Sequence, residues 1–225
     1  MATYQKGIET KKRFVELTYN KLRHQDASTL TVRDLAKENN CSPAVLYRYF
    51  DNLEYLITVA SVAFLDKYMR QYAKLMDSDK DPLQIYIEGW DLFNQYAFER
   101  PDVFYRLFWG KDNSVFGNAF QDYFELYPFD GSLKYTAYFY TMLFNSNMQE
   151  RDFLMLRRIE NLGVISGDEA QYYSVSNALL VKGLLEEAQS APADVRDQLR
   201  QQASSLIRYN MRTTLEEHPL PLASS

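Results

Sequence analysis

A twenty-residue segment near the beginning of the chain, TVRDLAKENNCSPAVLYRYF at residues 31–50, concentrates side chains that can recognise a polyanion. The guanidinium of Arg48 can donate two parallel hydrogen bonds to a phosphate or to a guanine edge. The hydroxyls of Tyr47 and Tyr49 can bind phosphate oxygens, and the methyl group of Ala44 can contact a thymine methyl. This combination of residue types favours contact with double-stranded DNA.

Two short helices joined by a tight turn are expected to position these side chains. Thr31, with an acidic residue three positions later, is typical of a helix N-cap. Ser42 followed by proline marks the start of the second helix, which we expect over residues 43–49. Asn40 lies between the helices, where the turn requires a left-handed backbone conformation that Asn tolerates better than most residues.

The second short helix carries more polar and aromatic side chains than a purely structural helix needs. Leu46 and Phe50 are four residues apart and can face the other helices, which leaves the remaining side chains outside. Two helices joined by a short turn, with such an outer face, are typical of a protein that reads the major groove. A helical hairpin with scattered surface aromatic residues is the alternative interpretation.

Longer helices are expected on both sides of this pair. The segment ETKKRFVELTYNKLR, residues 9–23, has apolar residues at helical spacing and basic residues near its beginning. Asp51 and Glu54 form a capping pattern that predicts a long helix running through Lys67. Further amphipathic patterns follow a proline at residues 82–97, and MQERDFLMLRRIENLG predicts a helix that ends at Gly163.

The composition favours an all-α fold, because the 225 residues include only 8 Gly and 7 Pro. The single cysteine excludes an intramolecular disulfide, and no segment contains the roughly eighteen uninterrupted apolar residues of a membrane-spanning helix. We therefore expect a cytoplasmic protein with no membrane partner. Neither a Gly-rich phosphate loop nor a metal-ligand cluster occurs, so we expect no cofactor, no metal and no catalytic residue.

The charges are unevenly distributed along the chain. The net charge is −5 overall, yet it is +4 over residues 1–50 and −9 over residues 51–225. A local basic segment can bind phosphates because the field of more distant acidic groups is screened beyond about 8 Å at physiological salt. The asymmetry is compatible with DNA binding by the N-terminal segment, and an ordinary solvated surface is the alternative.

The segment at residues 31–50, together with the following DNLEYL, resembles the TetR family of bacterial transcriptional regulators. The likeness rests on Thr31, the Leu-Ala pair at 35–36, Ser42 and the LYRYF of residues 46–50, and it covers about the first sixty-five residues. Two positions depart from the family pattern. Asn40 stands where the family usually has Gly, and Leu53 stands where it usually has a phosphate-binding Lys.

The resemblance implies an all-α protein with a helix-turn-helix DNA-binding domain at residues 1–52 and a helical effector-binding and dimerisation domain at 53–217. The sequence HPLPLASS at residues 218–225 is expected to form a flexible tail. It implies a homodimer that binds a palindromic operator, acting as a repressor released by a small-molecule effector. It also implies that Tyr47 contacts phosphate and that Thr31 and Arg33 begin the helix that meets DNA. The expected DNA contacts are Thr31, Arg33, Ser42, Pro43, Ala44, Val45, Tyr47, Arg48 and Tyr49.

Twenty aromatic residues lie between positions 86 and 144, where large rings and tyrosine hydroxyls favour a pocket for an apolar or aromatic ligand. Any one of them is more often a core residue. The ligand candidates are Trp90, Phe93, Asn94, Tyr96, Phe104, Phe108, Tyr123, Phe124, Tyr138 and Met142, with Glu88 and Arg106 as further polar partners.

The two C-terminal helical segments, 168–189 and 192–217, suggest self-association. Ser176 and Gly183 are small residues on the first segment, and the second carries an apolar stripe that includes Leu199 and Ile207. Two such stripes per chain could pair as a four-helix bundle, whereas packing within one chain is the alternative. A helical small-molecule-binding protein that has lost DNA affinity, and an enzyme using the aromatic pocket, are the competing functions.

Overall fold

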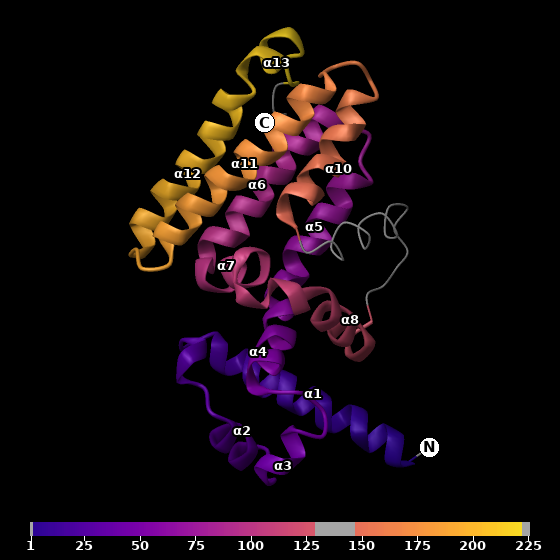
Figure 1. Ribbon diagram of the computed structural model, residues 1–225, viewed down its shortest axis with the longest axis vertical. Helices are drawn as coiled ribbons and strands as arrows, with labels where there is room; N and C mark the ends of the chain where they lie inside the picture. The colour runs from indigo at the N-terminus through magenta and orange to yellow at the C-terminus, as the bar shows by residue number, and fades with distance from the viewer. Residues whose placement is uncertain (1, 129–146, 222–225) are drawn as a thin grey trace. The chain divides into compact units, whose positions relative to one another are not determined.

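The structure is a computed structural model that describes residues 2–128 and 147–221 of the chain. Every regular element in these ranges is a helix, so the all-α fold expected from the composition is confirmed (Figure 1). None of the described helices combines the length and the apolar character needed to cross a bilayer.

The described residues form two compact units. The first unit comprises residues 2–66 and 111–128, and the second comprises residues 67–110 and 147–221. The domain boundary expected between residues 52 and 53 falls inside the first unit, at the beginning of a helix that packs against the N-terminal one.

The first unit contains five α-helices and three short 3₁₀ turns among its described residues. The α-helices are α1 (Ala2–Leu22), α2 (Val32–Glu38), α3 (Pro43–Leu46), α4 (Leu53–Val62) and α8 (Phe116–Leu126). Helix α4 packs against α1 and against α8, while α2 packs mainly against α3. Buried Phe14 and Phe50 meet edge to face with ring centroids 6.3 Å apart, which ties the end of the α3 segment to α1.

The local sequence signals around α2 are confirmed. Thr31 is the N-cap of α2, and its hydroxyl accepts a hydrogen bond of 3.2 Å from the backbone N–H of Asp34. Asn40 has a φ of 52°, the left-handed conformation expected for the turn. Pro43 is the first residue of α3, although the Ser42 side chain makes no capping hydrogen bond.

Helix α3 is shorter than predicted, since it ends at Leu46 instead of reaching residue 49. The next three residues form turns in which the N–H of Tyr49 donates to the carbonyl of Leu46 at 3.0 Å. Phe50 donates to the same carbonyl at 3.1 Å. The backbone therefore continues in a turn after α3 has ended. The β-branched and aromatic residues in this segment have low helix propensity, which disfavours continued α-helical hydrogen bonding.

The prediction of a helix capped by Asp51 and running unbroken to Lys67 was wrong in two respects. Asn52 is the N-cap of α4 and accepts a 2.7 Å hydrogen bond from the N–H of Tyr55, because its side chain stands three residues before that donor. The helix ends at Val62, and a 3₁₀ turn at Ala63–Leu65 precedes α5 (Asp66–Met76). The β-branched residues near the end of α4 lower its helix propensity.

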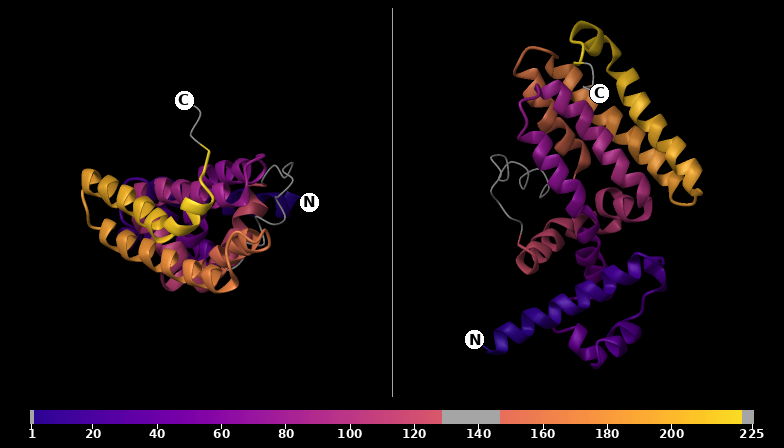
Figure 2. Two further views of the ribbon diagram at one scale, coloured as in Figure 1. Left: turned by 90° about the horizontal axis from the view of Figure 1, so that it is seen from above. Right: turned by 180° about the vertical axis from the view of Figure 1, so that it is seen from behind.

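The second unit contains the remaining helices: α5, α6 (Pro82–Glu99), α7 (Pro101–Trp109), α10 (Met148–Glu160), α11 (Gly167–Ala188), α12 (Ala193–Asn210) and α13 (Arg212–Glu217). Helices α6, α11 and α12 pack side by side, and α10 packs against α6 and α11 (Figures 1 and 2). The segment predicted as one helix over 192–217 is divided at Met211 into α12 and α13.

Capping residues fix where several of these helices begin and end. Asp81 accepts hydrogen bonds of 3.0 Å from the N–H groups of Leu83 and Gln84 at the start of α6. Gly163, with a φ of 73°, closes the turn after α10, as predicted. Ser166 and Glu169 form a reciprocal capping box at the start of α11.

Candidate functional site

The outer face of α2 and α3 holds most of the residues expected to contact DNA. Seven of them are exposed, and we call this group the α2–α3 face: Thr31, Arg33, Ser42, Pro43, Ala44, Tyr47 and Arg48. Opposite them, Leu35, Leu46 and Phe50 are buried. The small side chains of Ser42, Pro43 and Ala44 lie at the N-terminal end of α3. The hydrogen-bond donors Tyr47 and Arg48 follow its C-terminal end.

Tyr47 on the α2–α3 face has 56% of its surface exposed although it is a large aromatic residue. Val45 and Tyr49 are half-buried. A Cβ atom built on Gly7 of α1 would lie 3.7 Å from the Tyr49 ring, so this ring packs against α1. We infer that Tyr49 orients α3 and that Tyr47 and Arg48 are the more accessible donors.

Part of the positive charge of the N-terminal segment is neutralised locally. Lys21 forms a 2.6 Å ion pair with Glu38, and Lys11 lies 3.9 Å from a carboxylate oxygen of Asp122. Leu53, the position where the resembling family has Lys, is the half-buried first residue of α4. The exposed cations Arg33 and Arg48 on the α2–α3 face are therefore the main charges available to a phosphate backbone there.

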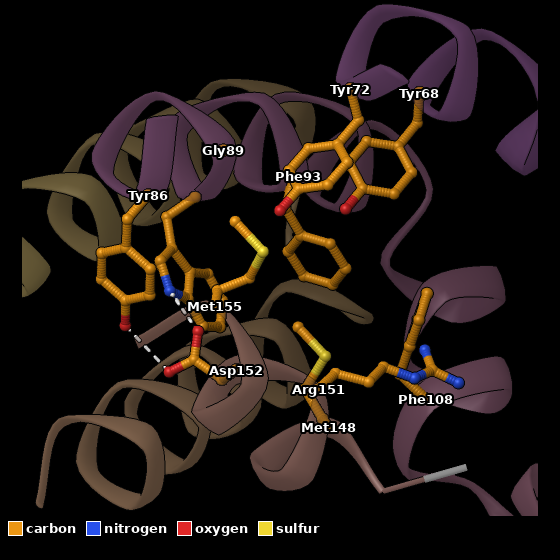
Figure 3. A pocket seen from close by; sticks show the side chains of 11 residues that line it. Tyr68, Tyr72, Tyr86, Gly89, Phe93, Phe108, Met148, Arg151, Asp152 and Met155 are labelled. Atoms are coloured by element: carbon orange, nitrogen blue, oxygen red, sulfur yellow. Dashed lines mark hydrogen bonds between the residues drawn. The ribbon is translucent and has the colours of Figure 1, made fainter. Parts of the chain in front are cut away.

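The second unit contains a cavity of ≈ 50 Å³ lined by residues of α5, α6, α7 and α10 (Figure 3). We call it the Arg151 cavity. Its lining residues are Tyr68, Tyr72, Tyr86, Gly89, Trp90, Phe93, Phe108, Met148, Arg151, Asp152 and Met155. Figure 3 shows the hydroxyls of Tyr68 and Tyr72 pointing toward Phe93. The walls are mostly aromatic, and α10 contributes a guanidinium group and a carboxyl group.

Asp152 is held on one side of the cavity by two hydrogen-bond donors. The hydroxyl of Tyr86 donates to one carboxyl oxygen at 2.8 Å, and the indole N–H of Trp90 donates to the other at 2.9 Å. The amide of Asn177 donates in turn to the Tyr86 hydroxyl at 2.9 Å. Burial raises the pKa of Asp152 well above its ordinary value, while the hydrogen bonds from Tyr86 and Trp90 lower it.

The hydrogen bonds continue from Asp152 toward α12. The amide of Asn210 donates to Asn177 Oδ1 at 2.8 Å and to Ser176 Oγ at 2.7 Å. A continuous polar chain therefore runs from α10 through α6 and α11 to the end of α12. Such a chain specifies one arrangement of the four helices, because each buried group would lose a partner in any other packing.

Arg151 lies on the other side of the cavity, beside aromatic rings. Its side chain is only 4% exposed, and its guanidinium carbon lies 4.9 Å from the centroid of the Phe108 ring. Burial lowers the pKa of Arg151 to about 9, and even this value leaves the group charged at neutral pH. The same charge lowers the pKa of Tyr68, which burial raises. Arg151 and Tyr68 both line the cavity.

The expected ligand residues are divided among several locations. Trp90, Phe93 and Phe108 line the Arg151 cavity. Phe104 is buried behind them, stacked on Phe108 with centroids 5.9 Å apart, and Tyr96 packs against Tyr68 at 6.2 Å. Other candidates lie elsewhere. The side-chain amide of Asn94 donates to Ser204 of α12, and the carboxylate of Glu88 accepts a hydrogen bond from Gln84. Tyr123 and Phe124 belong to the first unit, and Tyr138 and Met142 fall outside the described residues.

Eight lining residues were not among the sequence candidates: Tyr68, Tyr72, Tyr86, Gly89, Met148, Arg151, Asp152 and Met155. A signal for the charged pair was present in the sequence. Met148, Met155 and Ile159 recur at helical spacing along α10, and residues 151–152 fall within the same apolar stripe. Charged residues at core positions of an amphipathic helix are unusual and indicate a buried polar site.

Helices α11 and α12 also present large apolar side chains to solvent. Tyr172 and Leu179 on α11 and Tyr209 on α12 are each more than half exposed, and we call these three residues the α11–α12 face. Gly183 lies one turn beyond Leu179, and a Cβ built on it meets nothing within 4 Å. A second helix could approach closely at this position.

The apolar stripe of α12 that was expected to pair with a second chain packs within its own chain. Leu199, Ile207 and Met211 are buried, and α12 packs against α6 and α11. The intrachain alternative therefore holds for this stripe, because an amphipathic helix with two neighbours buries its apolar side against them.

Comparisons with protein-family models, with curated proteins and with solved structures gave no match for this chain.

Proposed function

We propose that the protein is a sequence-specific DNA-binding transcriptional regulator of the TetR type, and that α2 and α3 form its helix-turn-helix. The observation that carries the proposal is the α2–α3 face. Ala44 on α3 and Tyr47 and Arg48 in the turn directly after it are exposed, whereas Leu46 is buried and anchors the segment. A structural hairpin has no need for an exposed tyrosine beside an exposed arginine, whereas a groove-reading helix uses both.

The proposed DNA partner is a palindromic operator bound by a homodimer. One reading helix contacts only a half-site, so two copies related by a two-fold axis are needed, with half-sites about 34–36 Å apart or a multiple of that distance. The α11–α12 face is the proposed dimer contact, since large exposed apolar side chains on paired helices favour association with a like surface.

The proposed regulation is repression that a small effector relieves by entering the Arg151 cavity. An effector releases DNA only if it binds one conformation of the dimer more tightly than the other. At ≈ 50 Å³ the cavity is small for a drug-sized ligand. We propose that this arrangement is the DNA-competent form and that the effector favours a more open one.

The first test is capture of DNA. Purified protein is incubated with fragmented genomic DNA from its source at two salt concentrations, and the bound fragments are sequenced. We expect one palindromic sequence, recovered less well at the higher salt because phosphate contacts release counterions. Tyr47→Ala and Arg48→Ala should each abolish the enrichment of this sequence.

Matched variants separate recognition from folding. Tyr47→Phe removes only the hydroxyl of Tyr47 and should weaken binding less than Tyr47→Ala. Lys74→Ala removes an exposed cation of the second unit and should leave DNA recovery unchanged. Equal recovery by wild type and Tyr47→Ala, or no enriched sequence with a folded dimer, would exclude the proposal.

A second function is favoured by Leu53 and by the Arg151 cavity together. If the protein binds a ligand but no DNA, it is a helical small-molecule-binding protein whose DNA contacts have been weakened. Leu53 removes an ionic contact that the resembling family makes, and the cavity has a buried cation and aromatic walls independent of the α2–α3 face. Ligand binding without DNA capture would select this alternative.

A further inference from the structure

The Arg151 cavity combines one buried cation with aromatic walls. Tyr68, Phe93 and Phe108 come from three different helices and surround the same space as Arg151 (Figure 3). Edge-to-face contacts fix these rings, with 5.3 Å between the centroids of Phe93 and Phe108 and 5.7 Å between those of Tyr68 and Phe93. The cavity is thus a preformed aromatic enclosure with a charged group at one wall.

The two ionisable groups of α10, Arg151 and Asp152, are not equivalent toward a ligand. Both carboxyl oxygens of Asp152 already accept hydrogen bonds, from Tyr86 and Trp90, on the side of the cavity away from Phe108 (Figure 3). A guanidinium carries five N–H donors in a planar fork that fits a carboxylate. Arg151 can therefore bind an additional anion, whereas Asp152 has less capacity to bind an additional cation.

Electrostatics in the cavity also favour an anion. An anion close to a buried cation is stabilised more strongly in a low-dielectric site than in water. Tyr68 lines the same cavity as Arg151, and its hydroxyl is a second potential donor to a bound anion. Arginine and tyrosine donors together would fix the orientation of the bound group.

The aromatic side chains that line the cavity favour an aromatic ring in the part of the ligand beyond the carboxylate. Aromatic rings of a ligand can pack favourably edge to face against Phe93 and Phe108. The free volume of ≈ 50 Å³ fits little more than a carboxylate group. Met148 and Met155 also line the cavity, and their flexible thioether side chains can move to admit a single ring.

We propose that the Arg151 cavity binds an aromatic monocarboxylate, with the carboxylate on the guanidinium of Arg151 and the ring packed against the Phe93 and Phe108 pair. The inference rests on the proposed function, because it names the chemical class of the effector for that site. The binding itself is a property of the second unit and can be measured without DNA.

Three probes of nearly identical shape test the charge that the cavity recognises: benzoate is an anion, benzamide is neutral and benzamidine is a cation. Binding to the full-length protein is followed by the fluorescence of its two tryptophans, of which Trp90 lines the cavity, and by calorimetry. We expect benzoate to bind at least about tenfold more tightly than benzamide, a difference of about 1.4 kcal/mol. Benzamidine should bind more weakly than either.

Substitutions in α10 test whether Arg151 is the residue that recognises the carboxylate. Arg151→Met should abolish the preference for benzoate over benzamide, and Arg151→Lys should keep part of it because the charge remains. Arg157→Met is the matched control, since Arg157 lies on the same helix but is exposed and paired with Glu160 at 3.2 Å. This control should bind benzoate like the wild type.

Several outcomes would overturn the inference. They are benzamide binding as tightly as benzoate, benzamidine binding best, none of the three binding, or Arg151→Met keeping the preference. If Arg151→Met does not fold, the probe series on the wild type and Arg151→Lys still decides the charge. If hexanoate bound as tightly as benzoate, the proposed preference of the cavity for an aromatic ring would be overturned.

The DNA experiment distinguishes failure of this inference from failure of the proposed function. Operator capture without benzoate binding would support the proposed DNA-binding regulator and reject the proposal that the cavity binds an aromatic carboxylate. Benzoate binding without operator capture would reject the proposed DNA-binding function and support the ligand site in the Arg151 cavity. Both together predict that benzoate lowers operator affinity in the wild type and has no effect on Arg151→Met.

Discussion

The hydroxyl of Tyr86 on α6 donates to the buried carboxyl group of Asp152 on α10 across 2.8 Å. The same hydroxyl accepts a hydrogen bond from Asn177 on α11, so one oxygen atom joins three helices. Both residues are almost completely removed from solvent. The contact links the wall of the Arg151 cavity to the helices that carry the proposed dimer face.

Replacing Tyr86 by Phe should lower the free energy of unfolding by about 1–3 kcal/mol, because a buried carboxyl and a buried amide each lose a partner. Tyr209→Phe is the control, since Tyr209 is exposed and its change should stay within about 0.5 kcal/mol. Urea unfolding of both variants measures the difference. Equal stabilities would mean that the polar chain contributes little to packing.

Asp152→Asn should reveal the titration of the buried carboxyl. Because burial raises the pKa of Asp152 above its ordinary value of 3.8, the folded protein binds more protons than the unfolded chain between the two values. Wild-type stability contributed by this group therefore falls as pH rises through that interval, by at most about 1.4 kcal/mol per pH unit. The asparagine variant lacks this dependence. Its deficit relative to wild type should shrink as the pH rises above about 3.8 in urea titrations, and a growing deficit would contradict the raised pKa.

Two glycines in helices should respond oppositely to alanine. A Cβ on Gly89 would lie 2.8 Å from the ring of Tyr72, so Gly89→Ala should cost about 1–3 kcal/mol of stability through overpacking. Gly183 has open space around it, and Gly183→Ala should stabilise the monomer by up to about 1 kcal/mol through helix propensity. Thermal unfolding at low protein concentration checks both, and destabilisation by Gly183→Ala would contradict the prediction.

Local sequence signals predicted much of the helical structure. The Thr31 cap, the left-handed Asn40 and the turn at Gly163 that follows α10 were all correct, because each depends on a few neighbouring residues. The interruption after Val62 was missed, since helix periodicity continues through a 3₁₀ turn with little change.

The cavity was predicted only in part, because its lining comes from segments far apart in the chain. Trp90, Phe93 and Phe108 were among the candidates since they lie in the aromatic-rich region. Tyr68 and Asp152 were not, because only tertiary packing brings α5 and α10 beside α6. The unusual position of Asp152 within an apolar stripe was the available clue.

Leu53→Lys should strengthen DNA binding. Leu53 begins α4, directly after the Asn52 cap, where the resembling family places a phosphate-binding lysine. One added phosphate contact should steepen the slope of log affinity against log salt by about one unit and tighten binding to all sequences. Leu53→Gln has similar length without the charge and should leave the slope unchanged. An unchanged slope in the lysine variant would mean that this helix end does not approach the DNA backbone.

Leu179→Glu should convert the proposed dimer into monomers. Leu179 is 52% exposed on the α11–α12 face, and a carboxylate there would face its own copy or apolar groups across a two-fold axis. Leu162→Glu is the matched control, because Leu162 is 61% exposed but lies in the turn after α10. Sedimentation should show a dimer for wild type and Leu162→Glu and a monomer for Leu179→Glu. The monomer should also lose operator binding, since a single reading helix contacts one half-site. A dimer that survives Leu179→Glu would place the contact between chains elsewhere on the surface.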